Sequence, residues 1–303
     1  MEGWVGIGLT DSRCGPRYHE DVGLGCYILM AILPLAPVWS QDPDPYDLVR
    51  RSISQDQLDW VRMKDYTWQA RSVEKRLDSH GNVESIKREA WETVMLNGQP
   101  YRRTMERDGK LLSPEEQRSE QKKLDRETEK LSSETPAEKQ RRLEEAEKRR
   151  RREFAFLSEI PELFDLKYEG VSTVDGRPVW VVSGVPRPGA KAKSGDAKML
   201  LKVRGRMWID QATYQWARVE AETTDTISWG LFLARLHPGA KMVFEQTEVT
   251  GELWFPKRLL LTGSGRVGLV KRLAQDEEIE WSHYRRFSVD SKIVTEPPPN
   301  SHN

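Results

Sequence analysis

Hydrophobic and polar residues alternate along several segments in the second half of the chain. In the segment 201–209, Met207 and Ile209 fall on one face, and Trp208 falls on the other face with the charged residues. The segment 214–222 alternates in the same way, and a short Asp-Gln-Ala-Thr turn separates the two. A period of two is typical of β-strands, in which successive side chains point to opposite faces. The two segments therefore predict a β-hairpin with one apolar face and one charged face.

Dipeptides that favour tight turns separate the other alternating segments. Asn-Gly occupies residues 97–98, and Asp-Gly occurs at residues 108–109 and again at residues 175–176. Both dipeptides adopt the left-handed backbone that matches the twist of a hairpin. Counting the segments between turns predicts roughly ten strands, most of them sequential and antiparallel.

Helical patterns appear at two places. Apolar residues recur at helical spacing in the segment 43–61, which predicts an opening amphipathic helix. A highly charged insertion, residues 113–159, interrupts the strands, and within it Ser113-Pro114 and Thr135-Pro136 each place an N-cap residue before a proline. The pattern as a whole predicts a β-rich α+β fold. We expect a single curved antiparallel sheet, an unclosed half-barrel, with the amphipathic helix and two charged helices.

The charged insertion supports two interpretations. Its apolar stripe is thin, since it consists of Leu124, Leu131 and Leu143. We therefore expect most of the insertion to be solvated. The basic run KRRRR at residues 148–152 favours the other interpretation, an arm that binds a protein partner or a membrane surface.

The N-terminal region has the pattern of an export signal. Residues 22–40 carry no charge and end in Ser40, and a polar segment follows. This pattern predicts a signal region over residues 1–40, cleavage before Gln41 and a periplasmic protein. Prolines at positions 34 and 37 disfavour a continuous membrane helix, so an inner-membrane anchor and a buried helix are the alternatives.

Cleavage at that point has a chemical consequence. Both cysteines, Cys14 and Cys26, precede the predicted cleavage site. The mature chain would then have no disulfide, thiolate metal site or cysteine nucleophile. We expect the β domain to extend over residues 41–292 and the tail, residues 293–303, to be disordered.

Composition and motifs argue against several classes of function. The 303 residues include 32% charged residues, yet the formal net charge is zero, which argues against nucleic acid as a partner. The five histidines are scattered without metal-ligand spacing. The run GSGRVG at residues 263–268 lacks the Lys-Ser/Thr of a phosphate loop and predicts a bent strand. No nucleophile motif or paired carboxylates are recognisable, so we expect no enzyme activity, no cofactor and no metal, and an esterase or glycosidase is the least favoured class.

Tryptophan is abundant, with 11 residues in the chain. Any one tryptophan is most simply a core residue. A curved sheet with an aromatic inner face is, however, also suited to an apolar ligand. The candidate lipid-binding residues are Trp180, Trp208, Trp216, Trp254, Met207 and Ile209.

Two stretches resemble a known family. GRMWIDQATYQWARVEAE at residues 205–222 and ELWFPKRLLLTG at residues 252–263 resemble bacterial outer-membrane lipoprotein-sorting and carrier proteins of the LolA/LolB-like group. The resemblance implies an unclosed antiparallel barrel wrapped over helices, with a concave apolar side that takes lipid chains. The charged insertion and the loop at residues 186–196 depart from the family pattern.

These observations lead to one expected function and one alternative. We expect a periplasmic carrier that binds lipid or lipoprotein acyl chains non-covalently and contacts membranes transiently. The alternative is a structural or interaction protein of the cell envelope, whose charged helices bind an envelope protein. The carrier predicts an internal cavity, whereas the interaction protein predicts a core filled by its own side chains.

Overall fold

The structure is a computed structural model, and it describes residues 42–63, 65–78, 80–229, 234–249, 251, 253–267 and 271–286. The predicted signal region and the predicted disordered tail lie outside the described residues. All described residues belong to one unit, Asp42–Asn303.

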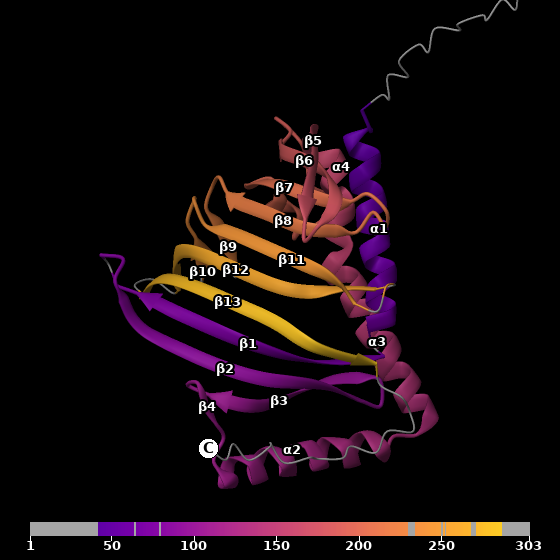
Figure 1. Cartoon of the computed structure of the whole chain (residues 1–303), viewed down its shortest axis with the longest axis vertical. Coiled ribbons are helices and arrows are strands. Elements are labelled where there is room, and N and C mark those ends of the chain that lie inside the picture. Colours follow the sequence, from indigo (N-terminus) through magenta and orange to yellow (C-terminus); the bar gives the residue numbers. More distant parts are fainter. Residues whose placement is uncertain are drawn as a thin grey trace, which may run out of the picture. The chain divides into compact units, whose positions relative to one another are not determined.

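A single antiparallel sheet dominates the described part of the chain (Figure 1). Its strands are β1 (Tyr66–Leu77), β2 (Val83–Leu96), β3 (Gln99–Arg107), β4 (Lys110–Leu111), β5 (Phe164–Val174), β6 (Arg177–Pro186), β7 (Val203–Asp210), β8 (Trp216–Thr223), β9 (Ile227–Trp229), β10 (Ala234–Leu236), β11 (Lys241–Val249), β12 (Leu253–Val267) and β13 (Lys271–Arg286). They are ordered β4-β3-β2-β1-β13-β12-β11-β8-β7-β6-β5, with β10 joining β12 to β9. The order is open at both ends, so the prediction of an unclosed antiparallel sheet is confirmed. The extra strands beyond the expected ten are the short β4, β9 and β10.

The predicted turns form as expected from their dipeptides. Asn97 and Gly98 have φ angles of 50° and 82°, and Asp175 and Gly176 have φ angles of 48° and 79°. These left-handed conformations suit a two-residue hairpin loop. They fix the register of β2 on β3 and of β5 on β6.

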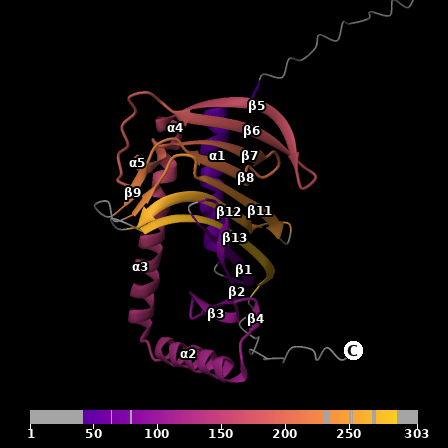
Figure 2. The ribbon, with the colours of Figure 1, turned by 90° about the vertical axis from the view of Figure 1, so that its left-hand side faces the viewer.

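The amphipathic helix α1 (Pro45–Met63) packs on one face of the sheet, which we call the inner face. Its buried residues Leu48, Val49 and Ile53 contact a core that includes Met207 and Ile209. The three residues share one side of the helix because their spacing follows the helical period. Figures 1 and 2 show α1 crossing the strands within the curve of the sheet.

The charged insertion folds into α2 (Pro114–Ser132) and α3 (Pro136–Ala155), as predicted. Both helices begin with a capping box, made by Ser113 with Glu116 and by Thr135 with Glu138. Three short elements follow: η1 (Phe156–Glu159), α4 (Ile160–Leu163) and, after β6, α5 (Ala197–Leu200). Figure 2 shows α3 running from α2 at one end of the sheet to α4 at the other.

Helix α2 does not share the inner face with α1. Leu124 and Leu131 are buried against Leu96, next to Val94 and Tyr101 of β2 and β3. Inner-face positions on β2 are odd-numbered, so Val94 and its partner Tyr101 lie on the other face of the sheet, which we call the outer face. Most other side chains of α2 and α3 are exposed, in line with a solvated insertion. The thin leucine stripe is therefore the side that attaches α2 to the outer face of the sheet.

Candidate functional site: an apolar cleft on the inner face

An open cleft of about 780 Å³ lies on the inner face beside α1. Its floor is formed by strands β5 to β8, β11 and β12, and one wall is formed by the end of α3 with η1 and α4. The volume falls within the roughly 300–1,000 Å³ that is usual for small-molecule sites. The described inner face is thus only partly covered by α1.

The floor is apolar because of the alternation along each strand. Inner-face positions in the cleft include Val182, Met207, Met242, Phe244 and Leu261. Residues that face each other on neighbouring strands are both apolar, since Met207 pairs with Val182 and Met242 pairs with Leu261. The residues beside them along the strands point to the outer face, and they are charged in β7 (Arg206) but apolar in β11 (Val243) and β12 (Leu260). An apolar surface therefore continues across neighbouring strands without a charged side chain between them.

The chemistry of the inner face changes at strand β13. Gln275 and Glu277 line the last part of the cleft. Glu277 pairs in register with Glu74 of β1, which pairs in turn with Lys87 of β2. Opposite residues in an antiparallel pair share a face, so this one row of the inner face, from Glu277 through Glu74 to Lys87, is charged. The apolar cleft ends at this boundary.

The helical wall is also apolar. Phe154 at the end of α3, Phe156 and Leu157 in η1, and Ile160 in α4 all line the cleft. Glu159 fixes this wall to the loop after β6, because its carboxylate accepts backbone N–H bonds from Lys193 (2.7 Å) and Ser194 (3.1 Å). These bonds lower the pKa of Glu159 from its ordinary value.

The loop at residues 186–196 is therefore held at a defined place. Its Pro, Gly and Lys content alone favours a flexible loop, but the bonds to the carboxylate of Glu159 hold it in place. Ala190 and Ala192 also pack against the small core beneath η1.

Trp216 belongs both to the cleft and to the contact with α1. Its ring lines the cleft, and its Nε1 donates a 2.8 Å hydrogen bond to Oδ1 of Asp56 on α1. Gln246 donates a second bond to the same oxygen at 3.3 Å. Burial raises the pKa of Asp56 above its ordinary value, although these bonds oppose the rise. Trp216 is thus positioned by a carboxylate that is costly to ionise.

Further polar groups are buried beside this carboxylate. Asp59, one turn along α1, accepts a 2.8 Å bond from Gln215 and a 3.1 Å bond from the backbone N–H of Trp254. Burial raises the pKa of Asp59 as well. Among the described residues, four buried oxygens in this region have no hydrogen-bond partner, namely Ser52 Oγ, Asp59 Oδ1, Gln215 Oε1 and Gln246 Oε1. The contact between α1 and the sheet is therefore apolar at one end of the helix and polar in its middle.

The six candidate residues from the sequence separate into three groups. Met207 and Trp216 line the cleft. Ile209 is fully buried in the core under α1, and Trp180 packs against that core with its ring 5.2 Å from the ring of Tyr214. Trp208 and Trp254 pack together with Val179 in a separate cluster.

That separate cluster lies on the outer face. Trp208 pairs in register with Arg218, whose guanidinium lies 5.4 Å from the Trp208 ring centroid. The guanidinium of Arg177 lies 5.2 Å from the ring of Trp254. Arginines thus cover both tryptophans on the face opposite the cleft.

Sequence reasoning missed several cleft residues. Met242, Phe244 and Leu261 lie in runs of three apolar residues, so only the register of β11 and β12 shows which of them face the cleft. Phe156 and Leu157 had a weaker signal, because they follow a helix whose composition is dominated by charge. The run GSGRVG begins within strand β12, where Gly263 and Gly265 are part of the cleft floor.

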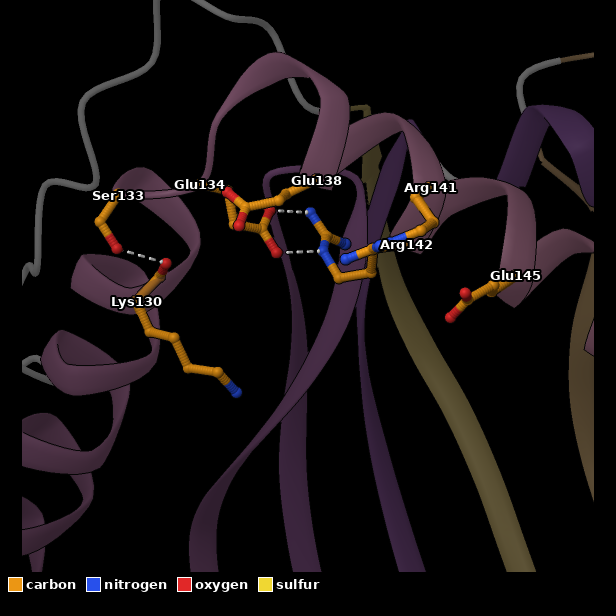
Figure 3. Close-up of a pocket in the computed structure, with 7 residues that line it drawn as sticks. All are labelled: Lys130, Ser133, Glu134, Glu138, Arg141, Arg142 and Glu145. Atoms are coloured by element: carbon orange, nitrogen blue, oxygen red, sulfur yellow. Dashed lines mark hydrogen bonds and ion pairs between the residues drawn. The ribbon is translucent and has the colours of Figure 1, made fainter.

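A second hollow, at the corner between α2 and α3, has a different chemistry (Figure 3). Arg142 donates bonds of 2.7 and 2.8 Å to the two carboxylate oxygens of Glu134. The remaining lining side chains are charged or polar, namely Lys130, Ser133, Glu138, Arg141 and Glu145. The ion pair connects the linker between the two helices to α3, and the hollow is lined mainly by charged and polar groups.

The described residues contain no group of three or more His, Cys, Asp or Glu side chains that could hold a metal ion. Within the same residues, no helix is long and apolar enough to cross a membrane.

Comparison with known proteins gave structural matches only. No family model and no curated protein matches the sequence. A domain named for outer-membrane lipoprotein sorting from Vibrio parahaemolyticus is 11% identical, with 81% of this chain and 95% of that chain covered and a TM-score of 0.29. A LolA superfamily protein from Nitrosomonas europaea is 8% identical, with coverage of 84% and 99% and a TM-score of 0.28. MucB from the MucA/MucB complex of Pseudomonas aeruginosa is 12% identical, with coverage of 81% and 100% and a TM-score of 0.23.

These TM-scores are low, and the matches carry no conclusion about function. The chain is similar, at this level, to LolA-superfamily and lipoprotein-sorting structures.

Proposed function

We propose that the cleft binds the apolar chain of a lipid or of a lipoprotein acyl group without covalent chemistry, and that the protein is a carrier in the bacterial periplasm. The observation that most supports this proposal is the open 780 Å³ cleft with its continuous apolar floor. If the protein were instead an interaction protein, its own side chains would fill the core. The floor residues Met242, Phe244 and Leu261 are, however, only partly buried. The uncharged segment 22–40 supports the proposed location.

The physics of transfer sets what the cleft has to provide. Each buried methylene contributes about 0.8 kcal/mol, so a chain of roughly 14 methylenes needs about 11 kcal/mol of replacement burial when it leaves a membrane. An apolar floor beside an aromatic and aliphatic wall can supply contacts on more than one side of the chain. The change to charged residues at β13 places polar side chains at one end, where the polar part of a lipid would lie.

A chain-length series tests the proposal. We expect the affinity for saturated fatty acids to rise about fourfold for each added methylene, or roughly 200-fold from ten to fourteen carbons. Dissociation constants below the critical micelle concentration can be measured by displacement of a fluorescent fatty acid. Affinities that do not change with chain length would contradict burial of the chain in the cleft.

A pair of matched variants locates the binding. Ala221 lines the cleft, so Ala221→Trp should fill part of it and weaken binding of the fourteen-carbon acid at least tenfold. Val185 lies on the outer face of β6 and is 52% exposed, so Val185→Trp is the control and should leave the affinity unchanged. Equal losses in both variants, with both proteins folded by circular dichroism, would place the binding site elsewhere.

A further inference from the structure

Glu277 is the one charged residue of the described cleft floor that lies at an inner-face position. It pairs in register with Leu261, which lies on that face, and opposite residues share a face. Five other charged residues of the lining sit beside an inner-face residue along their strands, so alternation directs their side chains to the outer face: Arg206, Glu220, Glu222, Lys241 and Arg266. Arg235 pairs with Arg266 and shares its face.

A single row of inner-face positions leads across the floor to Glu277. In the order of the strands, the row consists of Gly205, Ala221, Met242, Leu261 and Glu277. Neighbouring strands lie about 4.8 Å apart, so the row spans roughly 19 Å. Its other four residues are uncharged and mostly apolar. An apolar chain that lies along this row would therefore place its polar end at the carboxylate of Glu277.

The cations near Glu277 are paired with other carboxylates. Directly opposite Glu277 on β1 is Glu74, which forms an ion pair with Arg76 at 3.6 Å. Lys87, the next residue of this row on β2, pairs with Glu89 at 2.9 Å. Glu277 is half-buried and has no hydrogen bond or ion pair of its side chain among the described residues. Like charges that face each other across strands destabilise a sheet, so this carboxylate lacks a balancing cation.

We propose that Glu277 determines the headgroup specificity of the cleft, and that the preferred ligand is an aminolipid, whose apolar chain lies along the floor and whose ammonium group binds the carboxylate of Glu277. The inference rests on the proposed function, because it names the class of lipid that the same cleft takes. An ammonium group has three N–H donors, and its bonds to a carboxylate are charge-assisted. A carboxylate at the end of the chain would instead add a third negative charge beside Glu277 and Glu74.

The half-buried position of Glu277 sets the expected strength. A hydrogen bond to a charged group corresponds to roughly tenfold to 100-fold in affinity. Solvent screens a half-buried carboxylate, so the lower end of this range applies. We expect a fourteen-carbon primary amine to bind about tenfold more tightly than the alcohol of the same length, and the acid to bind more weakly than the alcohol. The preference should decrease as salt rises.

Three fourteen-carbon ligands that differ only in their polar end test the specificity. The amine, the alcohol and the acid are compared at pH 7, where the amine is cationic and the acid anionic. Displacement of an uncharged fluorescent probe gives the three dissociation constants. Glu277→Gln keeps the size of the side chain and removes its charge, so the ratio of amine to acid affinity should fall about tenfold or more. Glu277→Lys should invert the ratio.

Two further variants serve as matched controls. Glu280 is exposed and lies on the outer face of the same strand, opposite Arg258, so Glu280→Gln should leave the ratio unchanged. Ala221→Trp fills part of the cleft and should weaken the amine and the acid alike, which also leaves the ratio unchanged. An equal change of the ratio in Glu277→Gln and Glu280→Gln would overturn the proposal. Equal affinities of the amine and the acid for the unaltered protein would overturn it without any variant.

Natural headgroups provide the last comparison. Lysophosphatidylethanolamine and lysophosphatidylglycerol with the same fourteen-carbon chain differ in the ammonium group, and the ethanolamine lipid should bind several-fold more tightly. Equal affinities of these two lipids would overturn the aminolipid assignment. The chain-length series separates this inference from the proposed function. Affinity that rises with chain length without a preference for the amine overturns this inference alone, whereas a preference for the amine without dependence on chain length overturns the proposed burial of the chain.

Discussion

The bond between Trp216 and Asp56 gives a quantitative prediction about the contact of α1 with the sheet. Trp216→Phe keeps an aromatic ring at the cleft but removes the Nε1 donor, which leaves Oδ1 of Asp56 with the 3.3 Å bond from Gln246. A hydrogen bond to a charged group contributes about 1.5–3 kcal/mol. We therefore expect the free energy of unfolding at pH 7 to fall by about 2 kcal/mol, or Tm to fall by roughly 4–8 °C.

The companion variant Asp56→Asn identifies the source of this loss. Asparagine can still accept the indole N–H bond, but a bond between neutral groups contributes only about 1 kcal/mol. Trp216→Phe should thus lower the free energy of unfolding about half as much in the Asp56→Asn background as in the parent. Urea unfolding of all four proteins gives the coupling free energy directly. An equal cost in both backgrounds would refute the argument that the buried carboxylate holds Trp216.

The pH dependence of the same cycle has a definite sign. Burial raises the folded pKa of Asp56 above its unfolded value, so folding favours the protonated carboxyl. The parent protein bears the cost of an ionised Asp56 at pH 7, and this cost decreases as pH falls through the raised pKa. The charged neighbours Asp59 and Arg150 act in opposite directions on this pKa. The coupling between positions 56 and 216 should therefore be largest near pH 7 and shrink toward the ordinary carboxyl range.

Two further substitutions separate stability from ligand binding. Ile209→Ala should lower the free energy of unfolding by about 2–5 kcal/mol, because Ile209 is fully buried under α1, yet it should leave fatty-acid affinity unchanged since Ile209 does not line the cleft. Asp59→Asn should leave the free energy of unfolding at pH 7 equal or higher, because burial raises the pKa of Asp59 and an amide can donate to the unpartnered Oε1 of Gln215. The advantage of this variant over the parent should disappear at acid pH. A lower free energy of unfolding at pH 7, measured with urea, would show that the ionised carboxylate is required.

Alternation of side chains predicted the sheet but not which residues meet across it. The Met207 face and the Trp208 face were separated correctly by period alone, because a strand places neighbours on opposite sides. The period does not say which face α1 covers, so Trp208 and Trp254 could not be assigned to the outer face. Strand pairing between segments far apart in sequence supplied that information.

The helical wall of the cleft was hidden for a different reason. Charged residues dominate the insertion, and the apolar residues of the wall, Phe154, Phe156 and Leu157, come only at its end. A solvated helix was therefore the better prediction from composition. The bonds from Lys193 and Ser194 to Glu159 depend on a loop whose composition indicates flexibility, and no local pattern predicts such a contact.

The pairing of β1 with β13 has a consequence for how the chain reaches its folded state. These two strands are joined along eleven residue pairs, such as Ala70 with Trp281, and more than 190 residues of sequence lie between the end of β1 and the start of β13. Because β13 also pairs with β12, it joins the early strands to the rest of the sheet. A growing chain without β13 would leave both β1 and β12 with unpaired edges, which are templates for aggregation. Such long-range pairing slows folding, so a chaperone that shields these two edges until β13 is available would raise the yield of folded protein.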